Sequence, residues 1–148
     1  MTCPICNEPA SRLVSHHDHI RDEVESRLKE LIVLHDPDLW GSEVDRFRRS
    51  GVMSRHRFRG EVAMCDRCNT LENAWKIGSN PGAGFLPISF SLTPTEIQVA
   101  RATKLANGRK VAEIYVRSVW MRERRRHKRF LRLAKAFAER YHAERFSG

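Results

Sequence analysis

Apolar residues between positions 20 and 47 recur at the spacing of amphipathic helices. In the first stretch they lie three or four positions apart with charged residues between them, which predicts a helix that runs to about residue 34. Asp36 and Pro37 then supply an N-cap and a proline for the first turn, so a second, short helix begins there and ends near Gly51. The two predicted core stripes are Ile20, Val24, Leu28, Leu31 and Ile32, and then Leu39, Trp40, Val44 and Phe47.

Short apolar segments on either side of these helices are typical of strands. Residues 13–14 end one such segment, and residues 61–64 form another. A helix is predicted for residues 70–76, with two apolar side chains one turn apart on one of its faces. Residues 79–84 contain glycine, proline, serine and asparagine, a composition that predicts a linker.

The last third of the chain predicts long helices. Residues 85–92 are apolar and extended, with no recognisable chemistry. Thr93 and Glu96 then form a capping box that opens a helix, which ends at Asn107-Gly108. Residues 109–141 continue as one long helix or two, with an apolar stripe expected to serve as core or as a dimer seam. That stripe consists of Phe130, Leu133, Ala134, Phe137 and Tyr141.

The net charge of the chain is +9, and all of the positive excess lies in its last third. Residues 1–100 carry 12 basic and 14 acidic side chains, whereas residues 101–148 carry 15 and 4, so their net charges are −2 and +11. Such a basic block suits a polyanion, most simply nucleic acid, although a solvated helix without a partner has the same composition. An arginine-rich group between residues 46 and 59 is a second candidate surface. The residues assigned to DNA are Arg59, Arg122, Arg124, Arg125, Arg126, Lys128, Arg129 and Arg132.

Four cysteines form two Cys-x-x-Cys pairs, Cys3 with Cys6 and Cys65 with Cys68. In a chain without an export signal, such pairs favour metal thiolates over disulfides. Two pairs can complete a tetrahedral zinc site that has no open position for water, so we expect the zinc to be structural. A redox dithiol and free buried cysteines are the alternatives.

Between the two cysteine pairs lies a dense group of ionisable side chains, His16-His17-Asp18-His19. Imidazoles and a carboxylate can bind a divalent ion while one neutral imidazole stays available as a general base. The alternatives are a polar loop, an adventitious metal-binding tract or a second structural zinc site. Neighbouring side chains of a regular strand point to opposite faces, so the chain must bend here if His16 and His17 share one site.

The order of these motifs resembles the phage recombination endonuclease VII family, which belongs to the HNH, or ββα-metal (His-Me finger), nucleases. The matching parts are the first cysteine pair, the histidine tetrad at the end of a strand, Arg59-Gly60, and Cys65-Asp66-Arg67-Cys68-Asn69. They run from residue 3 to about residue 76, roughly half of the chain. Each motif is weak by itself, but in this order around one shared zinc they are rather specific.

The resemblance implies an α+β fold that is mostly helical. Its zinc-stabilised ββα-metal core would occupy residues 1–78, with residues 20–59 as a helical insertion longer than the family minimum. Residues 79–92 would be a linker and an extended segment. Residues 93–148 would form a basic helical arm, with a long C-terminal helix that holds DNA by its backbone.

The resemblance also implies a role for each matching residue. His17 would be the general base that activates water for attack on a phosphodiester, and His19 would orient or contact the phosphate. His16 and Asn69 would hold a single catalytic ion, Mg²⁺ or Mn²⁺, which stabilises charge on the departing 3′ oxygen. The residues expected to support these groups are Asp18 and Asn73.

One departure from the family concerns the metal ligand. The family has aspartate where this chain has His16, although histidine occupies the equivalent position in HNH nucleases of the colicin type. An imidazole ligand shifts the metal preference toward softer ions such as Mn²⁺, Ni²⁺ or Zn²⁺.

The sequence therefore predicts a divalent-metal-dependent DNA endonuclease that leaves 5′-phosphate and 3′-hydroxyl ends. Its predicted partners are DNA and, through the C-terminal helix, a second copy of the chain. A non-catalytic zinc-ribbon protein that binds nucleic acid is the alternative. No apolar run approaches the roughly 18 residues that a membrane span needs, and no secretory leader precedes Cys3. We expect no membrane partner and a location in the cytoplasm of a bacterial or phage-infected cell.

Overall fold

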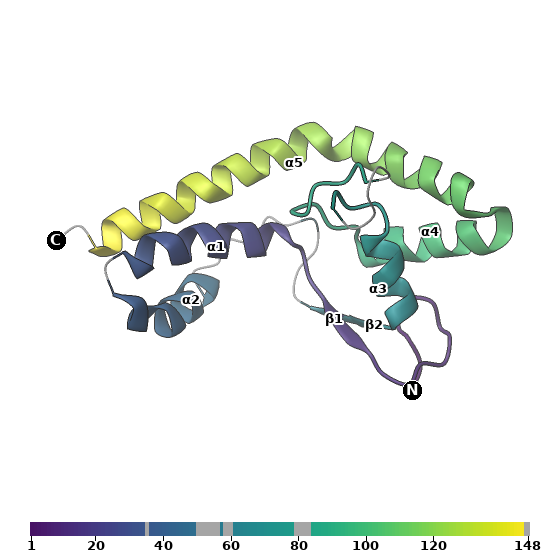
Figure 1. Ribbon diagram of the computed structural model, residues 1–148, viewed down its shortest axis with the longest axis horizontal. Helices are drawn as coiled ribbons and strands as arrows, with labels where there is room; N and C mark the ends of the chain where they lie inside the picture. The colour runs from purple at the N-terminus through teal and green to yellow at the C-terminus, as the bar shows by residue number, and fades with distance from the viewer. Residues whose placement is uncertain (35, 50–56, 58–60, 79–83, 147–148) are drawn as a thin grey trace.

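The structure, a computed structural model, describes residues 1–34, 36–49, 57, 61–78 and 84–146. These residues form a mixed α and β fold that is mostly helical, as the sequence predicted (Figure 1). In chain order the elements are β1 (Val14–His16), α1 (Ile20–Val33), the 3₁₀ turn η1 (Pro37–Leu39), α2 (Trp40–Arg49), β2 (Val62–Met64), α3 (Asp66–Asn73), α4 (Pro94–Asn107) and α5 (Arg109–Phe146).

The predicted helix starts and ends are confirmed where the sequence carries explicit capping residues. Asp36 caps η1 by accepting a hydrogen bond from the backbone N–H of Asp38. At the start of α4 the Thr93 side chain accepts from the Glu96 N–H, and the Glu96 side chain accepts from the Thr93 N–H. Gly108, with φ of +92°, ends α4 and lets the chain reverse into α5.

The longest element is α5, a single continuous helix of 38 residues. At about 1.5 Å per residue it is about 57 Å long. Figure 1 shows that α5 runs along one side of the whole molecule, with α4 beneath its first half and α1 beneath its second half. Of the two possibilities that the sequence left open, one long helix is therefore the correct one.

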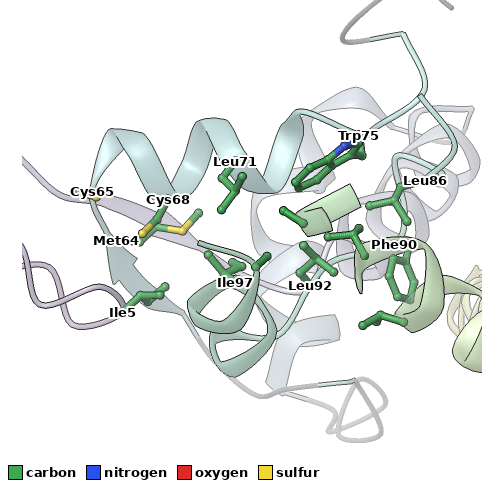
Figure 2. Close-up of a cluster of buried hydrophobic side chains, with 14 of the residues drawn as sticks. Ile5, Met64, Cys65, Cys68, Leu71, Trp75, Leu86, Phe90, Leu92 and Ile97 are labelled. Atoms are coloured by element: carbon green, nitrogen blue, oxygen red, sulfur yellow. The ribbon is translucent and has the colours of Figure 1, made fainter. Parts of the chain in front are cut away.

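Two separate clusters of buried side chains lie under the two halves of α5. The first joins the N-terminal cysteine turn, α3, the segment after it, α4 and the first half of α5 (Figure 2). The second joins α1, α2 and the last part of α5. The first cluster includes Ile5, Met64, Leu71, Trp75, Leu86, Phe90, Leu92 and Ile97, and the second includes Val24, Leu28, Ile32, Phe47 and Ala138.

The apolar stripe predicted near the end of α5 belongs mainly to the second cluster. Ala134, Phe137 and Tyr141 pack against the buried residues of α1 and α2. Leu133 was wrongly included in the stripe, because its side chain is 54% exposed. The stripe is thus covered by the same chain, and a homodimer through this helix stays a prediction.

The two strands bring the cysteine pairs and the histidines together. β1 pairs with β2 antiparallel, with Val14 opposite Met64 and His16 opposite Val62. β1 ends at His16 and α1 begins at Ile20, so the bend that the histidine tetrad requires lies between these two elements.

Residues 85 and 86 are held against the end of α3. The predicted linker before them lies mostly outside the described residues. The backbone N–H groups of Phe85 and Leu86 both donate to the carbonyl of Trp75 at 2.9 Å. Gly84 makes this approach possible, since a Cβ at that position would lie 2.4 Å from the carbonyl oxygen of Lys76. The apolar residues that follow are therefore fixed beside α3, where they contact the candidate site.

Candidate functional site

The four cysteines converge on one point although the two pairs lie far apart in the sequence. The Sγ atoms of Cys3 and Cys68 are 3.9 Å apart, and those of Cys6 and Cys65 are 3.8 Å apart. All four sulfur atoms lie within 4.8 Å of one another. Sulfur atoms around a tetrahedral zinc ion at 2.3 Å are separated by about 3.8 Å. The cluster can therefore hold a metal ion such as zinc, as the sequence predicted.

Backbone N–H groups favour the thiolate form of Cys3. Burial by itself would raise the pKa of this thiol, but N–H donors from Cys6, Cys65 and Ile5 outweigh it and lower the pKa to about 6. The N–H of Cys65 lies 3.3 Å from the Cys3 sulfur. Burial raises the pKa of Cys68, so a bound cation is what would favour its thiolate.

His16, the last residue of β1, is only 2% exposed. Its Nε2 lies 2.9 Å from the carbonyl oxygen of Leu92. Because a carbonyl only accepts hydrogen bonds, the ring proton is on Nε2 and the lone pair is on Nδ1, as in a metal-binding imidazole. Burial also lowers the pKa of His16, which keeps the ring neutral.

His17 and His19 share one carboxylate, that of Asp22 in the first turn of α1. His17 Nε2 lies 2.8 and 3.0 Å from the two Asp22 oxygens, and His19 Nδ1 lies 3.1 Å from one of them. Burial would raise the pKa of Asp22, but the hydrogen bonds from His19 and His17 lower it to about 2. Asp22 is therefore an ionised group that orients both rings. It was missed in the sequence, although its place three positions after His19 at a helix start was a usable signal.

Glu72 on α3 is the second residue that the sequence did not point to, and its side chain is completely buried. Its Oε1 lies 3.3 Å from Lys76 Nζ, and its Oε2 lies 3.9 Å from His19 Nε2. Neither oxygen accepts a hydrogen bond within the part of the chain that the structure describes. One donor atom each from His16, His19 and Glu72 lies within 4.8 Å of the others, so these three residues can hold a cation.

The position of Glu72 follows from the geometry of α3. It lies one helical turn after Cys68, so it points from the side of α3 that faces the core. A carboxylate one turn after a cysteine ligand was the available signal, but its partners come from β1 and from the loop before α1. Sequence spacing alone does not show that these segments meet.

Asn69 and Asn73 also lie on α3, one turn apart. The Asn69 side-chain oxygen accepts a weak hydrogen bond from Asn73 Nδ2 at 3.5 Å. Asn69 precedes Glu72 by three positions, so both lie on neighbouring parts of the helix surface. The role of Asn69 as a metal ligand beside His16 stays a prediction, as does the supporting role of Asn73.

Asp18 fixes the bend between β1 and α1. Its Oδ1 accepts from the N–H of Ile20 at 3.2 Å, and its Oδ2 accepts from the N–H of Arg57 at 2.9 Å. The side chain is 4% exposed, which makes these hydrogen bonds strong determinants of the local backbone. The supporting role of Asp18 in catalysis stays a prediction.

Residues 89–92, for which the sequence indicated no chemistry, form a platform for the histidines. Ser91 Oγ accepts from the N–H of His19 at 2.7 Å and donates to the carbonyl of His17 at 3.4 Å. Ser89 Oγ lies 2.9 Å from Nε2 of His127, which belongs to α5. The platform thus joins the histidine tetrad to the long helix.

Arg57 joins the platform to α4, because its guanidinium donates to the carbonyl of Ser91 and pairs with Glu96. Its guanidinium lies 2.6 Å from the carboxylate of Glu96 and 4.5 Å above the ring of Phe90. Two arginines of the predicted second surface between residues 46 and 59 therefore have acidic partners within the protein. Arg57 pairs with Glu96, and Arg48 pairs with Glu25 at 2.6 Å. Arg59, which was assigned to DNA, lies outside the described residues.

Most of the basic residues assigned to DNA on α5 form no ion pair with an acidic side chain in the described part of the chain. Arg122 is the exception, with Glu96 at 3.6 Å and Glu123 at 3.5 Å, whereas Arg126 lies 5.5 Å over the ring of Phe130. A shallow groove of about 460 Å³ follows one face of the helix. The exposed members are Arg122, Arg124, Arg125, Arg126, Lys128, Arg129 and Arg132, and the groove is lined by Lys128, Leu131, Arg132, Lys135, Ala136 and Glu139.

None of the helices in the described ranges combines the length and the apolar character that crossing a membrane requires. No protein-family model matches the chain, and no curated protein or solved structure matches it either. The function is therefore inferred from the residues of the site themselves.

Proposed function

We propose that this chain is a divalent-metal-dependent DNA endonuclease with a ββα-metal core. The observation that carries the proposal is Glu72, a completely buried carboxylate without a hydrogen bond among the described residues, beside the imidazoles of His16 and His19. A buried charge is costly unless it is paired or coordinates a cation. Lys76 supplies a positive charge near one oxygen, and the other oxygen faces the histidines.

His16 and Glu72 would hold the divalent ion, with Asn69 on the same helix as a further ligand. His16 would bind through Nδ1, because its Nε2 donates to Leu92. Bound there, the ion would supply the positive charge that stabilises the phosphate oxygens and the departing 3′ oxygen. A ligand set that contains imidazole favours Mn²⁺ or Ni²⁺ relative to Mg²⁺.

His17 would act as the general base. Asp22 accepts a hydrogen bond from its Nε2, which leaves the lone pair on Nδ1 to take a proton from water. The same carboxylate stabilises the imidazolium that then forms. The water oxygen attacks phosphorus, the bond from phosphorus to the 3′ oxygen breaks, and the departing 3′ oxygen takes a proton from solvent. His19 would contact the phosphate, and the products are a 5′-phosphate and a 3′-hydroxyl.

The basic face of α5 would hold the DNA backbone. The platform at residues 89–92 contacts both the histidine tetrad and α5, so a duplex bound along that helix would be in a fixed position relative to the site. Arginine and lysine contacts to phosphate carry no sequence information. We therefore expect cleavage with little sequence preference.

A non-catalytic zinc-ribbon protein that binds nucleic acid is the second candidate. The observation that favours it is that His16 and His17 each have a hydrogen-bond partner inside the protein, Leu92 and Asp22. Histidines with a purely structural role are satisfied in the same way. In this case the thiolate cluster and α5 would bind nucleic acid without cutting it.

Incubation with supercoiled plasmid and Mn²⁺ or Mg²⁺ separates the two candidates. A nuclease should convert the plasmid to nicked circles, and His17→Ala should slow this by about 10²–10⁴-fold because a general base contributes that much to the rate. His142→Ala is the matched control, since it removes an imidazole near the end of α5 that belongs neither to the cysteine cluster nor to the group of His16, His19 and Glu72. Plasmid that stays supercoiled with every ion, while the protein still binds it, would favour the second candidate.

Counting bound Mn²⁺ by its electron paramagnetic resonance signal tests the ligand set without relying on activity. We expect one weakly bound Mn²⁺ per zinc-loaded chain. Glu72→Gln should weaken this binding by more than about 10-fold, because it removes the charged ligand. Glu144→Gln, on the exposed surface of α5, is the control and should bind Mn²⁺ as the unchanged protein does. Equal binding by both variants would exclude Glu72 from the site.

A further inference from the structure

Three partly exposed side chains at the start of α1 form a second group of possible metal ligands. One donor atom each from His17, His19 and Asp22 lies within 4.8 Å of the others. This group shares His19 with the group of His16, His19 and Glu72, but its other two members are different. It contains two imidazoles and one carboxylate, a set that suits transition ions such as Zn²⁺ or Ni²⁺ better than Mg²⁺.

The spacing of the donor atoms is close to that of a metal site. His17 Nε2 lies 2.8 Å and His19 Nδ1 lies 3.1 Å from oxygens of Asp22. Ligand atoms around a tetrahedral zinc ion at 2.0–2.1 Å are separated by about 3.3 Å. An ion could therefore replace the shared protons after shifts of a few tenths of an ångström in these two contacts. The side chains are 21%, 25% and 50% exposed, which gives an ion from solvent a path to them.

We propose that His17, His19 and Asp22 form a second metal site, which takes a transition ion such as Zn²⁺ and by doing so turns the nuclease off. The inhibitory part rests on the proposed function, whereas the binding part does not. When a metal takes the lone pair of His17 Nε2, the proton of the neutral ring moves to Nδ1. Nδ1 then has no lone pair, so His17 cannot accept a proton from water.

His19 makes the two sites compete. Its Nδ1 faces Asp22 and its Nε2 faces Glu72, at 3.1 and 3.9 Å. A neutral imidazole has only one nitrogen with a lone pair, so His19 can serve one ion at a time. A transition ion on Nδ1 therefore weakens any contribution of His19 to the ion beside Glu72, and by linkage the reverse also holds.

Zinc titration of the full chain, already loaded with one zinc at the cysteine cluster, tests the binding part. Calorimetry or equilibrium dialysis should show one further zinc, weaker than the first. Asp22→Asn should weaken this second zinc by at least about 100-fold, since even residues behind a ligand change affinity by 10–100-fold. The control Asp38→Asn, on the exposed turn η1, should bind both ions. A single zinc in the unchanged chain, or a second zinc retained by Asp22→Asn, would overturn the proposal.

Two further measurements locate the ion. His16→Ala should keep the second zinc, because His16 is not one of its ligands; loss of that zinc in His16→Ala would place the ion at Glu72 and contradict the proposal. Co²⁺ added to zinc-loaded protein should bind without thiolate charge-transfer bands, as expected for nitrogen and oxygen ligands. Strong thiolate bands would mean that Co²⁺ had entered the cysteine cluster instead, which would also contradict it.

The inhibitory part is tested by adding Zn²⁺ to plasmid nicking supported by Mn²⁺. Nicking by the unchanged chain should fall by at least about 10-fold once the second site is filled. The residual nicking of Asp22→Asn should be resistant to the same Zn²⁺ concentration. If Zn²⁺ binds at the site but leaves nicking unchanged, the inhibitory part is wrong. If no variant nicks DNA, the proposed function fails while the zinc stoichiometry still decides whether the second site exists.

Discussion

Glu72 and Lys76 lie one helical turn apart near the end of α3 and are 0% and 4% exposed. Two opposite charges in such a place cost a large desolvation free energy, which their mutual attraction only partly offsets. Burial also lowers the pKa of Lys76, so the lysine holds its proton less firmly than an exposed one. A pair of this kind contributes little to folding and is more easily explained by a site that needs the carboxylate.

Replacing one member of this pair should lower the stability of the protein more than replacing both. Lys76→Met or Glu72→Met alone should lower the free energy of unfolding by about 3 kcal/mol, because each leaves an unpaired buried charge. The double variant should be close to the unchanged protein. Urea denaturation without added Mn²⁺ or Mg²⁺ measures all three. The partly exposed pair Glu113 and Arg117, at 3.7 Å, is the control and should show a coupling of only about 0.5 kcal/mol.

If the two single losses simply add in the double variant, Glu72 and Lys76 do not depend on each other. The carboxylate would then be stabilised by the histidines alone. That result would weaken the view that Lys76 balances Glu72 before a cation binds.

His127 should make the protein less stable in mild acid. Burial lowers the pKa of this histidine below 6.5, with a smaller contribution from Arg57 in the same direction and an opposing one from Asp18. Between the folded and unfolded pKa values the unfolded chain binds the extra proton, so stability is full above about pH 6.5 and falls as the pH decreases. The slope is at most about 1.4 kcal/mol per pH unit.

Comparing His127→Gln with the unchanged chain isolates this effect. His16 titrates in the same direction, because burial lowers its pKa too, but it is present in both proteins. Urea denaturation at several values between about pH 5 and 7 should show a smaller loss of stability in His127→Gln. Parallel pH profiles for the two proteins would mean that His127 is protonated equally in the folded and unfolded states.

At the scale of elements, α5 combines two roles on different faces. Its buried positions, which include Ala112, Val116, Val119 and Ala138, connect both clusters of core residues, whereas its arginines and lysines face outward. A continuous helix keeps the outward charges at fixed spacing along about 57 Å. If the proposed function is correct, these charges would contact the phosphates of more than one turn of duplex.

Changing Arg124, Arg125 and Arg126 together to alanine should reduce the salt dependence of DNA binding. Log affinity falls linearly with log salt concentration, with a slope of about −0.9 for each phosphate neutralised, so the slope should flatten by up to about three. Fluorescence anisotropy with a labelled duplex at several salt concentrations measures this. Metal binding at the histidines should be unchanged, because these arginines are exposed on α5.

The control triple variant changes Lys104, Arg109 and Lys110 to alanine. These residues are also exposed, but they lie around the turn between α4 and α5. Equal flattening by both triple variants would mean that affinity follows net charge rather than this part of α5. No flattening by the first variant would move the DNA-binding surface elsewhere.

At the scale of the whole molecule, the cysteine cluster and the platform belong to the same core. Cys3, Cys65 and Cys68 are buried among the side chains that also include Leu92, whose carbonyl accepts the hydrogen bond from His16. Loss of zinc from this cluster should therefore loosen the histidine site as well. The second core, under α1 and α2, does not include any cysteine.

Cys65→Ser should thus have a regional effect on stability. We expect loss of the tightly bound zinc and faster hydrogen exchange in β1, β2 and α3, because a structural zinc contributes its binding free energy to folding. Amides of α1 and the second half of α5 should stay more protected. Exchange followed by mass spectrometry checks this directly. A variant with no zinc but with unchanged protection in α3 would show that the cluster does not organise this part of the fold.

The sequence by itself determined most of the helix limits and the pairing of the four cysteines in one cluster. Helix limits such as the Thr93 capping box and the Asp36 N-cap depend on residues a few positions apart, so a local pattern is enough to predict them. The two cysteine pairs were also readable, because a tetrahedral site needs four thiolates and the chain contains four. The proposal of a nuclease remains an inference from the order of these motifs and from the site.

Only the tertiary structure decided which side chains surround the histidines. Glu72 and the platform at residues 89–92 come from segments far from the tetrad in the sequence, and each contacts the tetrad through long-range packing. An acid on a helix or an apolar extended segment looks the same in sequence whether it faces solvent or a site. Burial distinguishes a side chain that faces the site from one that faces solvent, and burial depends on how β1, α3 and α5 pack together. That packing is set by the sum of many contacts rather than by any local pattern.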